Sequence, residues 1–139
     1  MLEIIFSESH DAEFSKIIAN EFEHFAEKNN LINNYLPFTF IAKGNEKLMG
    51  IIKGYSYYDE AHISELVVLE DYRKQNIGRK LVDAVEKYCR ERKINNLNCS
   101  TYDFQAPDFY KKCGFALEFT RVNMENQKLS KHFFVKYFR

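Results

Sequence analysis

The sequence predicts an α/β (α+β) fold in which helices flank a mixed, mostly antiparallel sheet. Three apolar segments, residues 38–43, 47–58 and 61–69, are separated only by short turns, which is typical of an antiparallel meander. A helical pattern then separates residues 61–69 from a further apolar segment at 96–101. A helix that connects two neighbouring strands requires those strands to be parallel, so one central parallel pair is predicted.

The elements before the meander are predicted from residue type and spacing. Residues 2–7 are mostly apolar and indicate a first strand. Residues 11–28 predict an amphipathic helix, because apolar side chains recur there at helical spacing. These side chains are Phe14, Ile17, Ile18, Phe22 and Phe25. Residues 29–37 are rich in turn-forming residues and are expected to contain at most a short second helix.

The second half of the chain predicts two helices and the remaining strands. The helix after the meander ends near Lys93, and its apolar stripe consists of Leu81, Val82, Val85, Tyr88 and Cys89. A short helix at 106–113 has Pro107 in its first turn, which is a favoured place for proline, and Gly114 at its end. Residues 115–122 and 132–137 are predicted to close the domain as two strands.

Length and composition indicate one globular domain, residues 1–139. The formal net charge is zero, so neither nucleic acid nor a membrane surface is expected as a partner. No apolar run approaches the roughly 18 residues of a membrane span, and residues 1–6 lack the basic residues of a signal peptide. We therefore expect a cytoplasmic enzyme, either a monomer or a homodimer. The separated Cys89, Cys99 and Cys113 predict buried thiols, and the scattered histidines predict no metal site.

The segment from residue 66 to residue 81 combines the features of an anion-binding site. Residues 66–69 are predicted to end a buried strand, a basic loop follows, and a helix opens at Gly78. At such a junction unpaired backbone N–H groups and the helix dipole point to one spot. Asn76 tolerates the left-handed conformation, and Gly78 allows close approach of a ligand. The alternative is a solvated basic turn before a surface helix.

A second motif, FYKKCGF at residues 109–115, consists of a short predicted helix ended by glycine and followed by a strand. Together with Arg73-x-x-Asn76-x-Gly78, this motif resembles the GNAT superfamily of N-acetyltransferases, which has a pyrophosphate-binding loop and a later tyrosine motif in this order. The resemblance covers residues 38–120 best. It implies the GNAT fold, with central parallel strands splayed at a β-bulge, and acetyl-CoA as cosubstrate without a metal.

The resemblance also implies which residues contact coenzyme A. The backbone of the strand end would bind the pantetheine arm through Leu66, Val67, Val68 and Leu69. The Val68 N–H would point at the thioester carbonyl and stabilise the oxyanion. The loop and the first helical turn would bind the pyrophosphate through Arg73, Lys74, Gln75, Asn76, Ile77, Gly78, Arg79 and Lys80. Asp103 stands where many relatives have an asparagine that contacts coenzyme A, and Gln105 is the alternative for this contact.

Three residues are candidates for the chemistry. Tyr110 matches the family tyrosine that protonates the departing thiolate, and a phenol is protonated at neutral pH. Its other possible role is that of a packed aromatic side chain beside Phe109. An acceptor amine must lose a proton before it attacks, and His62 and Glu65 lie on the strand that leads to the bulge. Both are candidates for the general base, and a water relay is the alternative.

The leading hypothesis is an acetyl-CoA-dependent transfer of an acetyl group to a primary amine of a small molecule or peptide, by direct attack in a ternary complex. Asp59, Glu60 and Glu65 would favour a cationic acceptor. Residues 29–38 occupy the family's variable acceptor-binding region. The alternatives are a non-catalytic acyl-CoA-binding or sensor module on the same fold, and an unrelated α/β domain that binds another phosphate ligand.

Overall fold

The computed structural model describes residues 1–8 and 11–138. The chain divides into two compact units, Met1–Asn33 and Asn34–Arg139. No helix in the described residues is long and apolar enough to cross a membrane.

The first unit contains one helix, α1 (Ala12–Lys28), as predicted. The Asp11 carboxylate caps its start by accepting a hydrogen bond from the Glu13 N–H at 2.8 Å, and the Asn29 side chain donates to the Phe25 carbonyl at its end. The strand predicted for residues 2–7 is not formed, because residues 1–8 are neither helix nor strand. A strand needs a neighbouring strand for its backbone groups, and the described part of this unit offers none.

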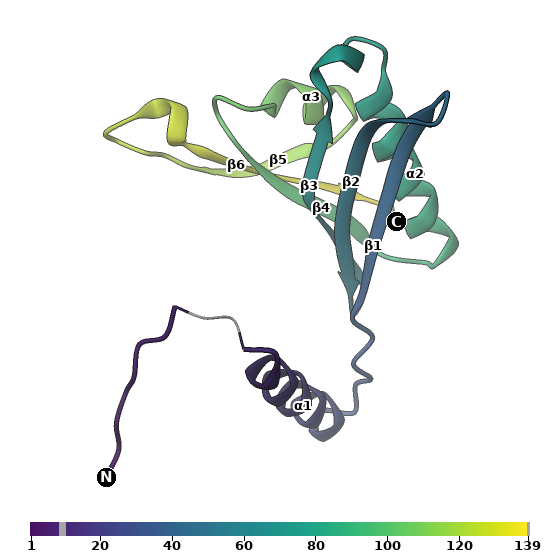
Figure 1. The fold of residues 1–139 in the computed structure, drawn as a ribbon. Coiled ribbons are helices and arrows are strands. Elements are labelled where there is room, and N and C mark those ends of the chain that lie inside the picture. The colour runs from purple at the N-terminus through teal and green to yellow at the C-terminus, as the bar shows by residue number, and fades with distance from the viewer. Residues whose placement is uncertain (9–10, 139) are drawn as a thin grey trace. The chain divides into compact units, whose positions relative to one another are not determined.

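The second unit is a six-stranded mixed sheet with helices against it (Figure 1). Its strand order is β1-β2-β3-β4-β6-β5. The strands are β1 (Leu36–Gly44), β2 (Lys47–Tyr57), β3 (Glu60–Val68), β4 (Asn96–Tyr102), β5 (Ala116–Arg121) and β6 (Lys131–Tyr137). The helices are α2 (Ile77–Glu91) and α3 (Pro107–Lys112), with 3-10 turns η1 (Glu70–Tyr72) and η2 (Gln127–Leu129). The predicted fold class is confirmed, since only β3 and β4 are parallel.

The core of this unit lies between α2 and the sheet. Four of the five residues of the predicted apolar stripe of α2 are buried, with Val82, Val85 and Cys89 fully inaccessible, and Tyr88 is partly buried. They belong to one cluster with Ile52 and Phe134 from the strands. Cys99 and Cys113 are also buried, so the three cysteines are free buried thiols, as predicted. This packing fixes the start of α2 against the end of β3.

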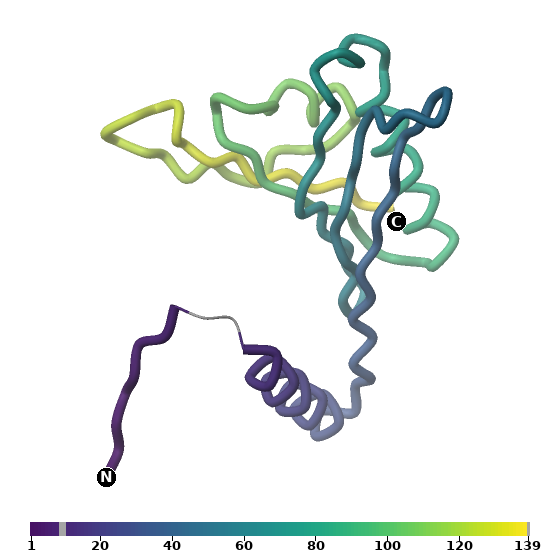
Figure 2. The backbone as a smooth tube through the Cα atoms, in the orientation of Figure 1, coloured from purple at the N-terminus to yellow at the C-terminus, as the bar shows by residue number. Residues whose placement is uncertain are grey.

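The parallel strands β3 and β4 are paired at one end only. Their register covers Glu60–His62 opposite Asn96–Asn98 and stops there. Beyond this point the strands diverge, as the ribbon and the backbone tube show (Figures 1 and 2). The register between β2 and β3 shifts at the same level, so Ser64 is an extra residue in β3, which defines a β-bulge. A side chain at Gly54, opposite this bulge, would collide with the His62 carbonyl oxygen.

Candidate active site

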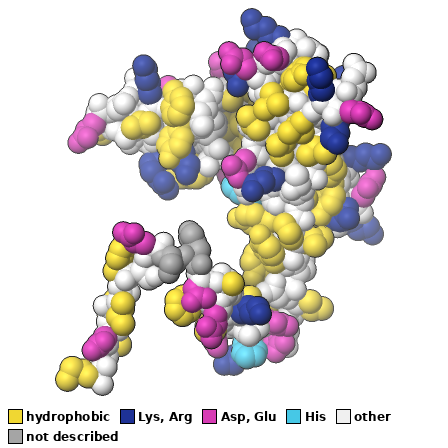
Figure 3. Space-filling model, in the orientation of Figure 1, with side chains coloured by type: hydrophobic (Ala, Val, Ile, Leu, Met, Phe, Trp, Pro, Cys, Tyr) yellow, Lys and Arg dark blue, Asp and Glu magenta, His cyan; other side chains and the backbone are white. Residues whose placement is uncertain are grey.

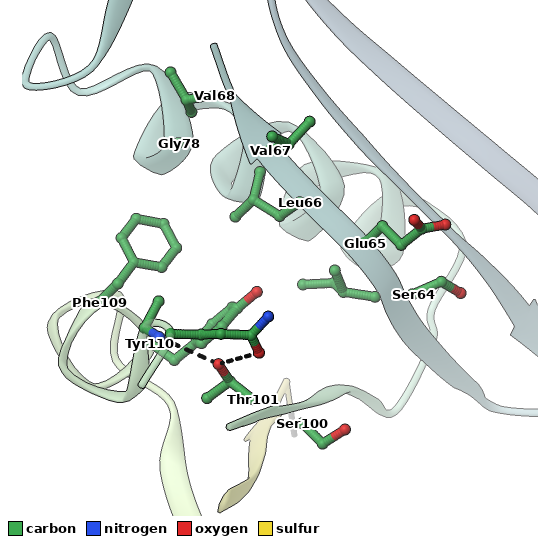
Figure 4. Close-up of a pocket in the computed structure, with 13 residues that line it drawn as sticks. Ser64, Glu65, Leu66, Val67, Val68, Gly78, Ser100, Thr101, Phe109 and Tyr110 are labelled. Carbon is green, nitrogen blue, oxygen red and sulfur yellow. Dashed lines mark hydrogen bonds between the residues drawn. The ribbon is translucent and has the colours of Figure 1, made fainter. Parts of the chain in front are cut away.

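The space between the splayed strands is a cavity of about 500 Å³. Its walls come from β3, β4, the start of α2 and the start of α3. Figure 4 shows Phe109 and Tyr110 on one side of it and Leu66 and Val68 on the other. The lining residues are Ile63, Ser64, Glu65, Leu66, Val67, Val68, Gly78, Ser100, Thr101, Gln105, Ala106, Phe109 and Tyr110. Seven of the sequence candidates therefore lie around one cavity.

A second cavity of about 260 Å³ adjoins the first at the basic loop. Val68, Gly78 and Phe109 line both, so the two cavities adjoin at these residues, and together they are called the groove. The second cavity brings together loop residues that were predicted to bind a pyrophosphate, namely Arg73, Lys74, Asn76, Ile77, Gly78 and Arg79. Five candidates line neither cavity, namely His62, Leu69, Gln75, Lys80 and Asp103. The groove leads from the N-terminus of α2 to the Tyr110 ring.

The loop before α2 has the backbone geometry of an anion site. Lys74 and Asn76 both have positive φ angles, 65° and 61°. Asn76 is the N-cap of α2, and its side chain makes no capping hydrogen bond. The N–H groups of the first helical turn are therefore left without a side-chain cap, and they can bind a phosphate oxygen.

The basic side chains of this loop have different roles in the structure. Arg73 donates a hydrogen bond to the Val68 carbonyl at 3.0 Å. Arg79 donates to the Lys112 carbonyl at 3.0 Å and lies 3.6 Å from the Asp83 carboxylate. Both guanidinium groups thus fix neighbouring elements, although both still line the groove. The Lys74 side chain lines it without an ion pair among the described residues.

The end of β3 presents backbone donors to the groove. The Leu69 N–H donates to the Met49 carbonyl of β2 at 2.8 Å. In an antiparallel pair successive residues point their N–H groups alternately toward and away from the partner strand. Leu66 and Val68 therefore direct their N–H groups away from β2, toward the edge of β3 that is not paired with β4 at this level. A Val68 N–H that is free of β2 is what the predicted contact with the thioester carbonyl requires.

Tyr110 is a buried side chain whose ring lines the wider cavity. Its ring centroid lies 5.2 Å from that of Phe109, 5.6 Å from Phe115 and 6.0 Å from Phe134. Burial, with a smaller effect of the thiols of Cys99 and Cys113, raises the pKa of the Tyr110 hydroxyl above its ordinary value. The hydroxyl is therefore neutral throughout the physiological pH range.

His62 lies where the pairing of β3 and β4 ends. Its Nδ1 is 2.7 Å from the Asn98 Oδ1, and the Asn98 Nδ2 donates to the Asn96 Oδ1 at 2.9 Å. This series of hydrogen bonds ends at Glu60, whose carboxylate accepts from the Asn96 Nδ2 at 3.3 Å. Because the Asn98 oxygen can only accept, His62 Nδ1 is the donor of this hydrogen bond, and in the neutral imidazole Nε2 is then the acceptor. Glu65 lines the cavity but forms an exposed ion pair with Lys53 at 3.4 Å.

The structure places Asp103 away from the groove. Its carboxylate accepts from the His132 Nε2 at 2.9 Å, and the Thr120 hydroxyl is 2.8 Å from the His132 Nδ1. Gln105 does line the groove, and its side-chain oxygen accepts from the Tyr102 N–H and the Thr101 hydroxyl.

Sequence reasoning missed several lining residues, above all Ser64, Ser100 and Thr101. The signal for the bulge that exposes Ser64 was Gly54, since glycine inside a strand often marks a bulge or a close approach of backbone. The described residues contain no group of three or more His, Cys, Asp or Glu side chains that could hold a metal ion.

The model of the acetyltransferase (GNAT) family matches residues 2–115, which is most of the chain. The chain belongs to the GNAT family. The resemblance found in the two motifs is therefore confirmed. The search of curated proteins gave no match.

Solved structures agree with this family. An acetyltransferase from Bacillus cereus ATCC 14579 is 25% identical, with a TM-score of 0.77 over 96% of this chain and 97% of that one. A candidate acetyltransferase from Agrobacterium tumefaciens is 20% identical, with a TM-score of 0.84 over 99% and 100% of the two chains. A candidate streptothricin acetyltransferase from Bacillus anthracis str. Ames, solved with acetyl coenzyme A, is 21% identical, with a TM-score of 0.67 over 80% and 68%. These likenesses support the GNAT fold.

Proposed function

We propose that this GNAT protein transfers the acetyl group of acetyl-CoA to a primary amine of a small molecule or peptide. The observation that carries the proposal is the single groove that joins the N-terminus of α2 to Tyr110 along the unpaired edge of β3. A relative of the same fold is bound to acetyl coenzyme A, which supports the choice of donor. The family model matches residues 2–115, which supports the proposal that residues 1–139 form one acetyltransferase domain.

The donor would lie along the groove with its pyrophosphate at the loop. The N–H groups of residues 74–79 and the positive end of α2 would hold the phosphates. The pantetheine arm would add to the edge of β3 through the N–H groups that Leu66 and Val68 direct away from β2. The Val68 N–H would then stabilise the oxyanion of the tetrahedral intermediate, an interaction often worth about 3 kcal/mol.

Tyr110 is proposed to donate a hydrogen bond to the departing sulfur. The raised pKa keeps the phenol protonated, but it also makes the phenol a weaker acid than a thiol, whose ordinary pKa is about 8.5. Tyr110 would therefore stabilise the thiolate as it forms more than it would transfer its proton completely. This role needs the hydroxyl near the thioester, and its position on the wall of the cavity supports it.

His62 is proposed as the general base in preference to Glu65. The hydrogen-bond chain from Glu60 through Asn96 and Asn98 orients the imidazole with Nδ1–H toward Asn98, which leaves Nε2 as the acceptor of the neutral ring. A neutral imidazole takes a proton at neutral pH far more readily than a carboxylate does. His62 does not line the cavity itself, but its partner Asn98 lies on the same face of β4 as Ser100, which does, so a water relay could connect His62 to the acceptor amine. His62→Gln should lower kcat/KM more than Glu65→Gln; the reverse order would identify Glu65 as the base.

The function is tested with acetyl-CoA and a panel of polyamines, aminoglycosides, amino acids and lysine peptides. Release of free thiol and the mass of the N-acetylated product are measured, and donor binding is measured by calorimetry in the same samples. Acetylated amine supports the proposal. Binding of acetyl-CoA without any product would indicate a non-catalytic acyl-CoA-binding module. Acetylation of hydroxyl or thiol acceptors alone would contradict the amine assignment.

A further inference from the structure

A second basic site lies on the β5–β6 hairpin, outside the groove. Arg121 of β5 and Lys131 of β6 are directly opposite each other in the sheet. Like charges that face each other across two strands are destabilising. None of the ion pairs of the described residues includes either side chain. The fold therefore holds two cations together without an acidic partner.

Both cations rest on aromatic rings instead. The Arg121 guanidinium carbon is 5.2 Å from the centre of the Phe133 ring, and the Lys131 ammonium is 5.6 Å from that of Tyr102. Phe133 is itself stacked on Phe119 at 4.4 Å. Figure 3 shows basic side chains beside hydrophobic ones over this hairpin. Such contacts hold the two charges in place but leave them uncompensated.

A cavity of about 330 Å³ lies beside the two cations. Its lining is Tyr102, Arg121, Val122, Asn123, Leu129 and Lys131. Two cations, one aromatic ring and two aliphatic side chains suit an organic anion with a hydrophobic body, because a guanidinium binds a carboxylate well.

The register of the sheet relates this cavity to the active site. Asn98, Ser100 and Tyr102 are alternate residues of β4 and so lie on one face, with Asn98 opposite His62 and Tyr102 opposite Lys131. Figure 4 shows Ser100, which lines the groove, pointing away from Thr101 on the opposite face. At about 3.3 Å per residue, the basic pair lies roughly 7–13 Å along β4 from the level of Ser100 and Asn98.

We propose that Arg121 and Lys131 form a carboxylate-binding site that selects acceptors carrying both an amine and a carboxylate. The amine would be acetylated at the end of the groove while the carboxylate is held at the hairpin. The spacing suits an extended molecule whose two charged groups are about 7–13 Å apart, such as a long ω-amino acid or a short peptide. The link to the acceptor rests on the proposed function, whereas the binding of a carboxylate does not.

The binding site is tested first, with benzoate and its neutral match benzamide titrated into the full chain. We expect benzoate to bind at least about tenfold more tightly, and Arg121→Gln/Lys131→Gln to remove this preference. Lys128→Gln removes a neighbouring charge that does not line the cavity, and it should keep the preference. Equal binding of the two probes, or an unchanged preference in the double variant, would overturn the site. Melting temperatures of the unliganded variants show that they are folded.

The acceptor is tested with ω-amino acids of increasing length and the matching amino alcohols. We expect kcat/KM to favour the carboxylate at spans of about 7–13 Å, and the double variant to lose this preference while it acetylates the alcohols unchanged. Equal rates for acids and alcohols at every length would overturn the role in acceptor selection. A failure to acetylate any amine would refute the proposed function instead, and the benzoate titration would still test the site.

Discussion

Gly78 is the position at which a single side chain should separate binding of the donor from folding. A Cβ placed there would lie 3.3 Å from two atoms of the Phe109 ring and 3.6 Å from a methyl of Val68. These contacts are tight but not overlapping, and α2 gains up to about 1 kcal/mol when glycine is replaced. The fold should therefore accept a side chain at this position. The same three residues line both parts of the groove, so the side chain would occupy their junction.

Gly78→Glu would add both bulk and a negative charge where the pyrophosphate is proposed to bind. A carboxylate about 6 Å from a phosphate charge costs about 1–3 kcal/mol at an effective dielectric constant between water and the protein surface, which is about 5- to 150-fold in affinity. Gly78→Gln adds the same bulk without the charge. Calorimetry with acetyl-CoA should give the order wild type, Gln, Glu in decreasing affinity. A folded Glu variant with unchanged affinity would show that the phosphates do not bind at this helix end.

Three further changes have expected outcomes. Tyr110→Phe should lower kcat by up to about 10²-fold, which is the lower end of the rate contribution of general acid catalysis, and leave the affinity for acetyl-CoA nearly unchanged. Full activity of the variant would show that Tyr110 only packs in the core. Lys136→Met should lower the free energy of unfolding by about 2 kcal/mol, because the Lys136 ammonium lies 2.7 Å from the largely buried Glu86 carboxylate. Lys87→Met breaks an exposed ion pair and should lower it by under about 0.5 kcal/mol. Equal losses for the two variants in urea unfolding would contradict this prediction. Burial raises the pKa of the Cys99 thiol to about 12, so the folded state keeps a proton that the unfolded state loses above its ordinary pKa of 9.0. The contribution of Cys99 to the free energy of unfolding should therefore fall by roughly 1 kcal/mol between pH 9 and pH 10, and the other buried thiols add to the slope. The free energy of unfolding should fall less steeply in Cys99→Ala than in the wild type, and an equal slope in both proteins would refute the assignment.

The sheet and helices of the second unit were largely predictable because their signals are local. The apolar periodicity of α2 and the Pro107 and Gly114 boundaries of α3 placed these helices within a few residues. The parallel pair followed from the intervening helix. The strand predicted at residues 2–7 failed because strand formation depends on a neighbour, and composition alone does not provide one.

The parts of the candidate site that depend on backbone conformation were predictable from the sequence. The parts that depend on hydrogen bonds between side chains far apart in the sequence were less predictable. The left-handed conformation at Asn76 follows from residue type, and the structure has it. Asp103 could not be placed in the same way, because its partner His132 is far along the chain and is brought to it by the pairing of β4 with β6. The tautomer of His62 likewise depends on Asn98, which nothing near His62 in the sequence indicates.

The groove exists because one strand keeps its pairing on one edge and loses it on the other. β3 remains paired with β2 up to Val68, but its pairing with β4 ends at His62, and the bulge at Ser64 lies just beyond that point. In a fully paired sheet the N–H groups of Leu66 and Val68 would be satisfied by β4, and no donor would remain for a thioester. The groups that would bind the donor are thus backbone N–H groups, and the residues to which they belong have ordinary apolar side chains. Because the groove depends on the backbone, it is retained although the loop has asparagine at position 76 and although Asp103 accepts a hydrogen bond from His132 and does not line the groove.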